Sequence, residues 1–546
     1  TLKNLIVKNC TAFYGGGIYI YNSTSLLENI SVYGNESVSH GAGIYLDYTA
    51  ATLRNVASYT NSSGSHAGGI FINNDYLDNS SPTIIGGSFH DNQAIYGVGG
   101  VFTQNCAPSF YQSNIVNNQG GWNDNENAGG LFLFNADVQL VSCIVSGNSS
   151  PQLEFDSTEP QSVESLSINY SLIQNGQDSI VTNDNGTVTW GDGNIDVNPM
   201  FVDTANGNYH LLASSQLINA GHPDSTDSDG TVADIGAYPY LNSYSGPTWY
   251  ITESGNDSTA TGASDDPFRS IQAGINFSSH ADSVAVAAGT YVENINFNGK
   301  NIAVIGENME TTIIDGNQSG SVVVFNNSET SSALLKNLTV KNGYLNDEGS
   351  EGGAGIYIDG ADPILENLIV TENTSDVNWG AGIFSKGSNT QLINVNVNNN
   401  NGTSWGGGFL SWSGNPTISN CVFNNNTGGL GGGLAFYSSD GNLINVEITS
   451  NTAGQGGGLI IYNGEVSIVN STISNNILNS SENIGGIFIT GSSEVSLINS
   501  IISGNEPNQI FTDTPSESGI IIINYCNIEG GQDSIATNDN GTVTWG

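Results

Sequence analysis

The chain has 546 residues, with 51 Asp and Glu against 8 Lys and Arg, and its formal net charge is −43. This balance excludes a nucleic-acid-binding protein, because such proteins need clustered cations to displace counterions from phosphates. Hydrophobic residues make up 37% of the chain, which is too many for a disordered polymer, and no apolar run is long enough to predict insertion into a membrane.

The first predicted elements are strands that follow a Gly-Gly-hydrophobic-aromatic motif. Copies lie at residues 15–19, 41–45 and 67–71, about 26 residues apart, and the motif returns many times after residue 350. A fixed period of this size is typical of a solenoid, in which each repeat is one structural turn. The segments between copies are short and β-branched, which excludes helical repeats. We therefore expect an all-β fold, a parallel β-helix with three short strands per turn.

A second motif follows these strands: an Asn after a short apolar segment, with another Asn six residues later. Asn tolerates the left-handed backbone of a tight corner. When turns stack in register, its amide can also bond the Asn of the neighbouring turn. We expect the first Asn of each pair to form a structural ladder. Its members are Asn29, Asn55, Asn367, Asn394, Asn420, Asn445, Asn470 and Asn499.

Residues 198–238 break the periodicity and are predicted to close a module. A loop inside this segment has oxygen ligands spaced two apart and a Gly for a sharp turn, a pattern typical of a structural calcium site. The candidate ligands are Asp224, Asp227, Asp229 and Asp234. The EF-hand spacing is not met, because its first position falls on Ser225, so a plain polar loop is the alternative. Calcium is the one cofactor that the sequence suggests.

A new module begins after a predicted linker at residues 241–248. Residues 176–191 return almost unchanged at 531–546. We therefore expect residues 1–240 to be the C-terminal part of one β-helix module and residues 249–546 to be the N-terminal part of the next. A short helix near 266–276 would cap the first turn of the new module, with Asp266 as its N-cap and Pro267 at its first position.

The module start at residues 250–316 and the closing segment at residues 198–238 resemble those of right-handed parallel β-helix, or pectin-lyase-like, repeat surface proteins of bacteria. The Gly-Gly-Ile and Asn repeats also resemble those of polymorphic outer-membrane, autotransporter-type proteins. The resemblance implies a right-handed parallel β-helix solenoid in tandem modules, each with an N-terminal capping helix. It also implies a secreted protein of the bacterial cell surface. It implies no single activity, because this fold carries lyases, hydrolases, adhesins and tail spikes.

The strands after each Gly-Gly motif have aliphatic residues at positions one and three, which should face inward, and position two should then face outward. An outward aromatic stripe needs covering, so it could pack on another copy of the chain and build a homo-oligomer or fibre. Coverage by the chain's own loops, or ring stacking between turns, is the alternative. The residues are Tyr19, Tyr45, Phe71, Phe102, Phe132, Tyr357, Phe384 and Phe488.

A further column lies three residues before the last Gly and holds Tyr14, His40, His66, Trp379 and Trp405. Two His residues are a weak metal or pH-sensing site, and a stacked surface column is favoured. Trp379, Trp405 and Trp412 are expected to be exposed and could stack on sugar rings. Glycans of a cell surface are therefore a possible partner.

The sequence lacks the sets of residues that β-helix enzymes use. No pair of basic residues suits a lyase, and no carboxylate pair suits a glycosidase. We therefore expect no enzymatic activity. The predicted function is that of a structural and adhesive repeat segment of a giant secreted surface protein, forming a rigid fibre or appendage. A carbohydrate-binding surface protein and a polysaccharide lyase or glycoside hydrolase are the alternatives.

Overall fold

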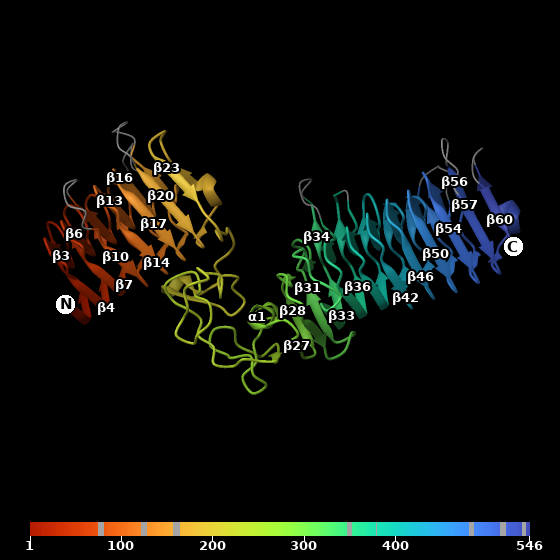
Figure 1. Ribbon diagram of the computed structural model, residues 1–546, viewed down its shortest axis with the longest axis horizontal. Coiled ribbons are helices and arrows are strands. Elements are labelled where there is room, and N and C mark those ends of the chain that lie inside the picture. Colours follow the sequence, from red (N-terminus) through yellow and green to blue (C-terminus); the bar gives the residue numbers. More distant parts are fainter. Residues whose placement is uncertain are drawn as a thin grey trace. The chain divides into compact units, whose positions relative to one another are not determined.

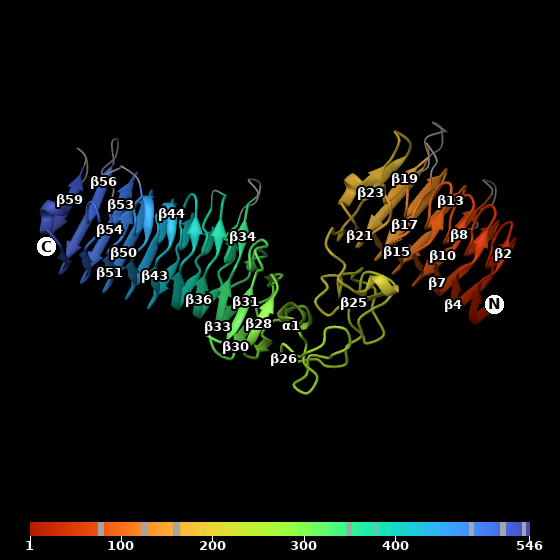
Figure 2. The same ribbon diagram turned by 180° about the vertical axis from the view of Figure 1, so that it is seen from behind.

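The computed structural model describes residues 1–74, 81–121, 128–156, 164–346, 352–377, 379–479, 485–513, 520–537 and 542–546. The chain forms two compact units, unit 1 (Thr1–Ser243) and unit 2 (Tyr244–Gly546). Each unit is a stack of strands that wind repeatedly around its own core, as Figure 1 and the reverse view in Figure 2 show. Among the described residues, no helix is long and apolar enough to cross a membrane.

Unit 1 has three parallel sheets and one antiparallel pair. The bent sheet contains β1 (Leu2–Lys8), β4 (Leu26–Tyr33), β7 (Thr52–Tyr59), β10 (Thr83–Ile85), β11 (Ser88–His90), β14 (Ser109–Tyr111), β15 (Asn114–Val116), β17 (Asp137–Val141), β18 (Ile144–Ser146), β20 (Ser165–Asn169), β21 (Leu172–Ile173) and β23 (Thr187–Trp190). The narrow sheet contains β2 (Thr11–Ala12), β5 (Glu36–Ser37), β8 (Ser62–Ser63) and β12 (Gln93–Ala94). The glycine sheet contains β3 (Ile18–Tyr21), β6 (Ile44–Asp47), β9 (Ile70–Asn73), β13 (Val101–Gln104), β16 (Leu131–Phe134), β19 (Leu153–Phe155) and β22 (Ile180–Val181). The antiparallel pair is β24 (Phe201–Asp203) and β25 (Asn208–Leu211), and short 3₁₀ turns lie at Gly176–Ser179 and Thr204–Asn206.

Unit 2 repeats the three sheets. Its bent sheet contains β26 (Thr248–Ile251), β27 (Ser283–Val286), β28 (Gly289–Val292), β30 (Ala303–Gly306), β31 (Thr312–Asp315), β33 (Leu334–Lys341), β36 (Ile364–Thr371), β39 (Gln391–Asn398), β42 (Thr417–Ser419), β43 (Val422–Asn424), β46 (Gly441–Ile444), β47 (Glu447–Thr449), β50 (Glu465–Val469), β51 (Thr472–Ser474), β54 (Glu494–Ile498), β55 (Ile501–Ser503), β57 (Ile520–Asn524), β58 (Asn527–Ile528) and β60 (Thr542–Trp545). Its narrow sheet contains β34 (Tyr344–Leu345), β37 (Thr374–Ser375), β40 (Asn401–Gly402), β44 (Thr427–Leu430), β48 (Thr452–Gln455) and β52 (Ile477–Leu478). Its glycine sheet contains β29 (Ile295–Asn296), β32 (Val323–Phe325), β35 (Ile356–Asp359), β38 (Ile383–Lys386), β41 (Phe409–Trp412), β45 (Leu434–Tyr437), β49 (Leu459–Tyr462), β53 (Ile487–Thr490), β56 (Ile510–Asp513) and β59 (Ile535–Thr537). Another 3₁₀ turn lies at Gly531–Ser534.

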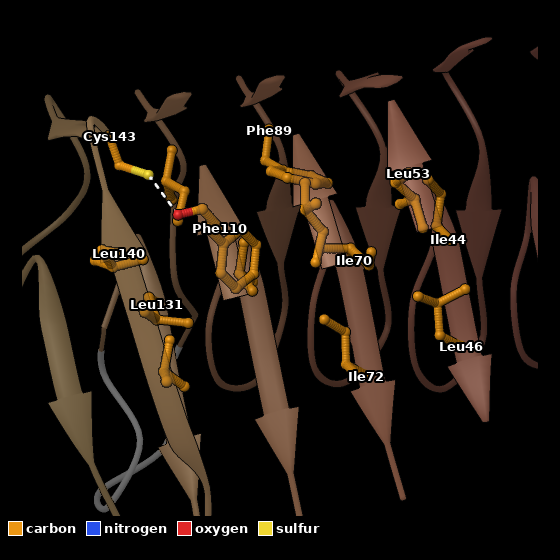
Figure 3. Packing of buried hydrophobic residues seen from close by; sticks show 14 of the residues in the cluster. Ile44, Leu46, Leu53, Ile70, Ile72, Phe89, Phe110, Leu131, Leu140 and Cys143 are labelled. Carbon is orange, nitrogen blue, oxygen red and sulfur yellow. Dashed lines mark hydrogen bonds between the residues drawn. The ribbon is translucent and has the colours of Figure 1, made fainter. Parts of the chain in front are cut away.

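Every strand of these six sheets pairs in parallel with the equivalent strand of the next turn. In unit 1, Leu27 lies opposite Leu53 and Ile44 lies opposite Ile70. The inward-pointing residues of successive turns therefore stack into columns of like side chains, which are fully buried and form one continuous core (Figure 3). The prediction of an all-β parallel β-helix solenoid is confirmed.

The bend in the bent sheet comes from residues in the left-handed conformation. Asn29 and Asn55, for example, have φ of 54° and 50° and divide their strands into two arms. The amide of Asn55 donates to the Asn29 side chain at 3.1 Å, and equivalent bonds join Asn394 to Asn367 and Asn445 to Asn420. The sequence-predicted Asn residues therefore sit at the corner between the arms, where their side chains line the surface.

The second Asn of each pair forms a different, buried ladder. Asn400 Nδ2 and the Asn400 backbone N–H both donate to Asn426 Oδ1, and Asn426 bonds to Asn451 in the same way. Each amide also donates to a backbone carbonyl of another turn, such as Val397 O for Asn426. The ladder members are Asn35, Asn61, Asn92, Asn118 and Asn148 in unit 1, and Asn373, Asn400, Asn426, Asn451, Asn476 and Asn505 in unit 2. In both units a Gln four residues after the last Asn accepts the final amide bond, at 2.8 Å in Gln152 and 2.9 Å in Gln509.

This buried ladder explains the Gly-Gly motif. A Cβ added to Gly433 would lie 2.6 Å from the Gly458 carbonyl oxygen and 3.0 Å from Asn451 Nδ2. A Cβ on Gly69 would lie 2.6 Å from the Gly100 oxygen and 2.9 Å from Asn92 Nδ2. The last Gly of the motif is thus required because the backbone passes directly against the next turn and its buried Asn.

The helix that begins unit 2 starts later than expected. It is α1 (Ile271–Phe277), with Ser270 as N-cap, so the assignment of Asp266 and Pro267 to its first positions is wrong. The Asp266 carboxylate instead accepts from the Thr261 backbone, in the loop that precedes the helix. The Glu293 carboxylate accepts from the first two helical N–H groups, at 2.8 and 3.0 Å. This anchors α1 to the first turns of the unit, where its residues Ile271 and Ile275 are fully buried.

Candidate functional site

The aromatic column of the glycine sheet in unit 1 is covered by the chain itself. Tyr45 is 8% exposed and Phe132 is fully buried, whereas Tyr19, at the start of the column, is 49% exposed. The rings stack from turn to turn, with 4.7 Å between the centroids of Phe71 and Phe102. A second layer covers them, because the neighbouring column of Tyr14, His40 and His66 stacks on these rings, His40 at 4.8 Å from Phe71 and His66 at 5.1 Å from Phe102.

The same holds in unit 2, where Phe384 and Phe488 are buried and Tyr357 is half-buried. The expectation of an open aromatic stripe is therefore wrong for Tyr45, Phe71, Phe102, Phe132, Phe384 and Phe488. The homo-oligomer or fibre stays a prediction. Alternation along the strand correctly placed these rings on the outer face of the sheet. It could not show that the loop before each strand folds back over that face.

The covering layer of unit 2 is richer in large aromatic residues and stays partly open to solvent. It contains the three predicted Trp residues and two Tyr residues, all half-buried: Trp379, Trp405, Trp412, Tyr437 and Tyr462. We call this set the aromatic platform. The prediction that Trp379, Trp405 and Trp412 are exposed is corrected in one respect, because their side chains are half-buried.

The platform follows the stacking of the turns. Trp412, Tyr437 and Tyr462 occupy the fourth position of β41, β45 and β49 and lie in register. Their ring centroids are 5.5 and 5.0 Å apart. Trp379 packs on Trp412 at 4.5 Å, and Trp405 meets Tyr437 edge-on at 5.1 Å. The parallel ladder thus spaces aromatic groups at one per turn over these three turns of unit 2.

A charged pair borders the platform at one end of this column. Lys386, in register with Trp412, has its Nζ 3.6 Å from the Asp359 carboxylate of the turn before. Together these residues give a strip with flat apolar faces next to charged hydrogen-bonding groups, an arrangement suited to ligands with both apolar and hydroxyl-bearing faces.

The Asp-rich loop of the closing segment is a hydrogen-bonded turn. Asp227 accepts from Gln112 Nε2 and from the Asp234 backbone, at 3.0 and 2.8 Å. Asp234 accepts from the Asn219 and Tyr240 backbones, both at 2.7 Å, and burial raises the pKa of its carboxyl to about 7. Asp229 likewise accepts from the Thr231 and Asn242 backbones.

The carboxylates of Asp227, Asp229 and Asp234 thus turn toward separate hydrogen-bond donors. In the described part of the chain, no three His, Cys, Asp or Glu residues are grouped so that they could hold a metal. The structure therefore does not bring Asp224, Asp227, Asp229 and Asp234 together as the predicted calcium site.

The closing segment itself packs on the second arm of the bent sheet in unit 1. The Ala237 backbone donates to the Asn114 side chain, and the Gly236 backbone donates to Ser142 O. At the other end, buried Tyr209 donates its hydroxyl to both oxygens of Asp91, at 2.9 and 3.0 Å. Sequence reasoning missed this contact, because the two residues are 118 positions apart and only the fold brings them together.

Asp91 is the centre of a small polar cluster. Its carboxylate lies 2.8 Å from His90 Nδ1 and also accepts from the Asn117 amide. Burial alone would raise the pKa of Asp91, but the hydrogen bonds from His90, Asn117 and Tyr209 outweigh it and hold the pKa below its usual value. The His90 ring stacks on Tyr59 at 4.8 Å, so the cluster is held rigidly against the sheet.

A cavity of about 730 Å³ lies beside this cluster, between the second arm and the beginning of the closing segment. Its floor includes Val116 and Ser146 from the sheet, and its wall includes Asp196, Phe201 and Tyr209. The sequence analysis recognised the closing segment that forms one wall but predicted none of the lining residues as part of a site, since they come from several turns and a non-repetitive segment.

No protein-family model and no curated protein matches the chain. Among solved structures, a pectin methylesterase in complex with a hexasaccharide is 11% identical, with a TM-score of 0.26, and the match covers 55% of this chain and 94% of that one. A pectin methylesterase from Erwinia chrysanthemi is 10% identical, with a TM-score of 0.27 and coverage of 56% and 94%. The A-module of a mannuronan C-5 epimerase from Azotobacter vinelandii is 8% identical, with a TM-score of 0.17 and coverage of 92% and 90%.

These likenesses concern the β-helix fold and do not extend to autotransporter-type repeats. They do correct one expectation. We expected no enzymatic activity because familiar catalytic motifs are absent, yet the solved structures that match are named as enzymes: pectin methylesterases, an epimerase and an alginate lyase.

Proposed function

We propose that the chain is an adhesive segment of an extracellular surface protein, and that it contacts glycans through the aromatic platform of unit 2. The observation that carries this proposal is the column of half-buried rings, Trp412, Tyr437 and Tyr462, set one per turn and flanked by Trp379 and Trp405. Large aromatic side chains that stay partly open on a folded protein are typical of binding surfaces.

The physical fit is with a sugar chain that runs along the stacked turns. The faces of aromatic rings carry partial negative charge, and they attract the C–H groups on the apolar face of a pyranose ring. Successive turns of a parallel β-helix are about 4.8 Å apart, so neighbouring rings can contact a glycan at repeated points. The stacked turns hold these rings in place, which reduces the entropy lost on binding.

The extracellular setting is part of the proposal. The net charge of −43 keeps such a protein soluble and favours repulsion between neighbouring copies. In this arrangement the two buried Asn ladders provide a stiff support, and the platform provides the adhesive contact.

The test is a glycan array followed by calorimetric titration of the full chain with the glycans that bind. Replacing both Trp379 and Trp412 by Ala should raise Kd by about tenfold or more, since each ring contact contributes about 0.5–1.5 kcal/mol. The matched control is Tyr525→Ala, which removes an 86% exposed aromatic residue of the same unit outside the platform, and its Kd should stay at the wild-type value. Absence of any bound glycan, or equal affinity of the double variant and the wild type, would contradict the proposal.

A further inference from the structure

We propose that unit 1 carries a separate binding site for a short neutral saccharide, in the cavity between the second arm of its bent sheet and its closing segment. The cavity has a volume of about 730 Å³, which is within the range of small-ligand sites in proteins, about 300–1,000 Å³. It lies in the other unit from the aromatic platform and shares no residue with it.

The cavity is a built feature with fixed walls. One wall is the closing segment, where the antiparallel pair β24–β25 places Phe201 and Tyr209 with their rings 5.1 Å apart and nearly perpendicular. The Tyr209 hydroxyl bonds to Asp91, which fixes this wall to the sheet. On the other side, Gln174 accepts from the Gly147 backbone at 2.6 Å and from the Ser146 hydroxyl at 3.2 Å, which fixes the ends of the strands.

These same bonds determine which polar groups face a ligand. The Oε1 atom of Gln174 is engaged by the sheet, so its amide N–H groups are the part available to a ligand. The amide of Asn117 donates to Asp91, so its Oδ1 is an acceptor toward the cavity. Asp196 holds the Asn175 backbone through Oδ1 at 3.0 Å and has a second oxygen that can accept. The residues that line the cavity therefore offer both donors and acceptors to a ligand.

This lining favours a neutral, hydroxyl-rich ligand. Hydroxyl groups both donate and accept, which matches alternating amide and carboxylate groups, and the Phe201 ring and Pro199 offer apolar surface to the C–H face of a sugar. Among the described residues that line the cavity there is the carboxylate of Asp196 but no Lys or Arg. An anionic saccharide would meet a carboxylate without a counter-charge, in a strongly acidic protein. A purely apolar ligand would leave the amides without partners.

The experiment is calorimetric titration of the full chain carrying Trp379→Ala and Trp412→Ala, which weakens the platform of unit 2 to the same extent in every sample. The probes are cello-, manno- and xylo-oligosaccharides of four units, with tetragalacturonate as the anionic comparison. We expect at least one neutral probe to bind and tetragalacturonate to bind at least about tenfold more weakly.

Two variants locate the binding. Ala205→Trp places a large side chain at the exposed mouth of the cavity and should weaken binding at least about tenfold, whereas Ala107→Trp, an exposed position of the same unit outside the cavity, should leave it unchanged. Gln174→Glu keeps the acceptor for Ser146 and Gly147 but removes the N–H donors, and should weaken binding several-fold. The inference is overturned if no neutral probe binds, if tetragalacturonate binds equally well, or if Ala205→Trp binds as the Ala107→Trp control does. Because the platform is weakened equally in every sample, a difference between Ala205→Trp and Ala107→Trp does not depend on whether the platform binds glycans.

Discussion

Units 1 and 2 share one internal scaffold and differ on their surfaces. Both contain a buried Asn ladder that ends on a Gln, at Gln152 and Gln509, and both have a glycine sheet with aliphatic residues pointing inward. The surface difference is seen at the fourth position of the strands in the glycine sheet. In unit 1 the successive strands β6, β9 and β13 hold the polar residues Asp47, Asn73 and Gln104 there, between Tyr21 and Phe134. In unit 2 the successive strands β41, β45 and β49 hold the aromatic residues Trp412, Tyr437 and Tyr462, between the charged residues Asp359 and Lys386 and the polar residues Thr490 and Asp513.

The difference shows which positions are constrained by stacking. A residue inside the solenoid contacts its equivalents one turn above and below, so its size and polarity must match theirs. A residue at the fourth position contacts solvent on one side and can change as long as its neighbours accommodate it. Function on this fold is therefore to be sought in the outer columns and in the non-repetitive closing segment.

The largest expected effect comes from breaking what the units share. Asn426→Leu in unit 2 and Asn118→Leu in unit 1 each remove the acceptor for the preceding Asn and the donor to a buried carbonyl, Val397 O or Phe89 O. Two or more buried groups are left unpaired, at about 1–3 kcal/mol each, so we expect a loss of about 3 kcal/mol in either unit. Chemical denaturation with hydrogen exchange as a local readout measures it.

The control for this comparison is Asn445→Gly, at an exposed left-handed corner. Its amide makes one surface bond to Asn420, and Gly accepts the φ of 57° without strain, so the loss should stay below about 1 kcal/mol. If Asn426→Leu and Asn118→Leu lower the free energy of unfolding as little as Asn445→Gly does, or if the two Leu variants differ clearly from each other, the buried Asn ladder is not the scaffold that the units share.

A smaller effect should follow from a feature for which the described part of unit 2 shows no equivalent. Tyr209→Phe in unit 1 removes the hydroxyl bond to the Asp91 carboxylate, and bonds to charged groups contribute about 1.5–3 kcal/mol. We expect hydrogen exchange in the closing segment, residues 198–240, to accelerate about tenfold while the solenoid turns keep their protection. Tyr19→Phe removes a hydroxyl bond to Asp47 on the Gly sheet and should leave the closing segment unchanged.

The smallest effect is a pH dependence specific to unit 1. Burial, with His40 next to it, lowers the pKa of His66 to about 4, and burial also lowers the pKa of His40. In the unfolded chain the two His side chains take up protons near pH 6.5, whereas in the folded column of His40 and His66 they stay neutral to a lower pH. The column therefore contributes its full stability above about pH 6.5 and loses it as the pH falls toward 4.

The measurement is hydrogen exchange of β6 and β9 at pH 7 and pH 4.5, corrected for intrinsic exchange. A local readout is needed because the raised pKa of Asp234 acts in the opposite direction elsewhere in unit 1. We expect protection in β6 and β9 to fall several-fold in the wild type, and this fall to disappear in the double variant His40→Phe, His66→Phe. The same fall in both proteins would show that the column is not its source.

Much of the fold was predictable because the repeat is strict. The turns of a β-helix are indicated by Gly at positions such as Gly69 and Gly433 and by Asn at corners such as Asn55, because few other residues fit those backbone positions. The helix boundary was missed by several residues because Asp266 and Ser270 are both good N-caps, and the Glu293 carboxylate, just after β28, anchors the helix start beside Ser270.

The surface was predicted less well. Alternation placed Phe71 and Phe384 on the outer side of their strands, but it could not reveal that His40 and Trp379 fold over them. The spacing of Asp224 to Asp234 suggested a metal-binding loop. In the structure the Asp234 carboxylate instead accepts hydrogen bonds from the backbone N–H groups of Asn219 and Tyr240, which lie outside the loop.

By itself the amino-acid sequence determined the solenoid, its period and its inward columns, because each of these depends on residues that repeat at fixed spacing and meet only their neighbours one turn away. The tertiary structure alone decided which outer rings are covered, where the Asp carboxylates point, and how residues as far apart as Val116 and Tyr209 enclose a cavity in unit 1. Those features depend on non-repetitive loops whose path is set by packing against several turns at once, and no local pattern encodes it.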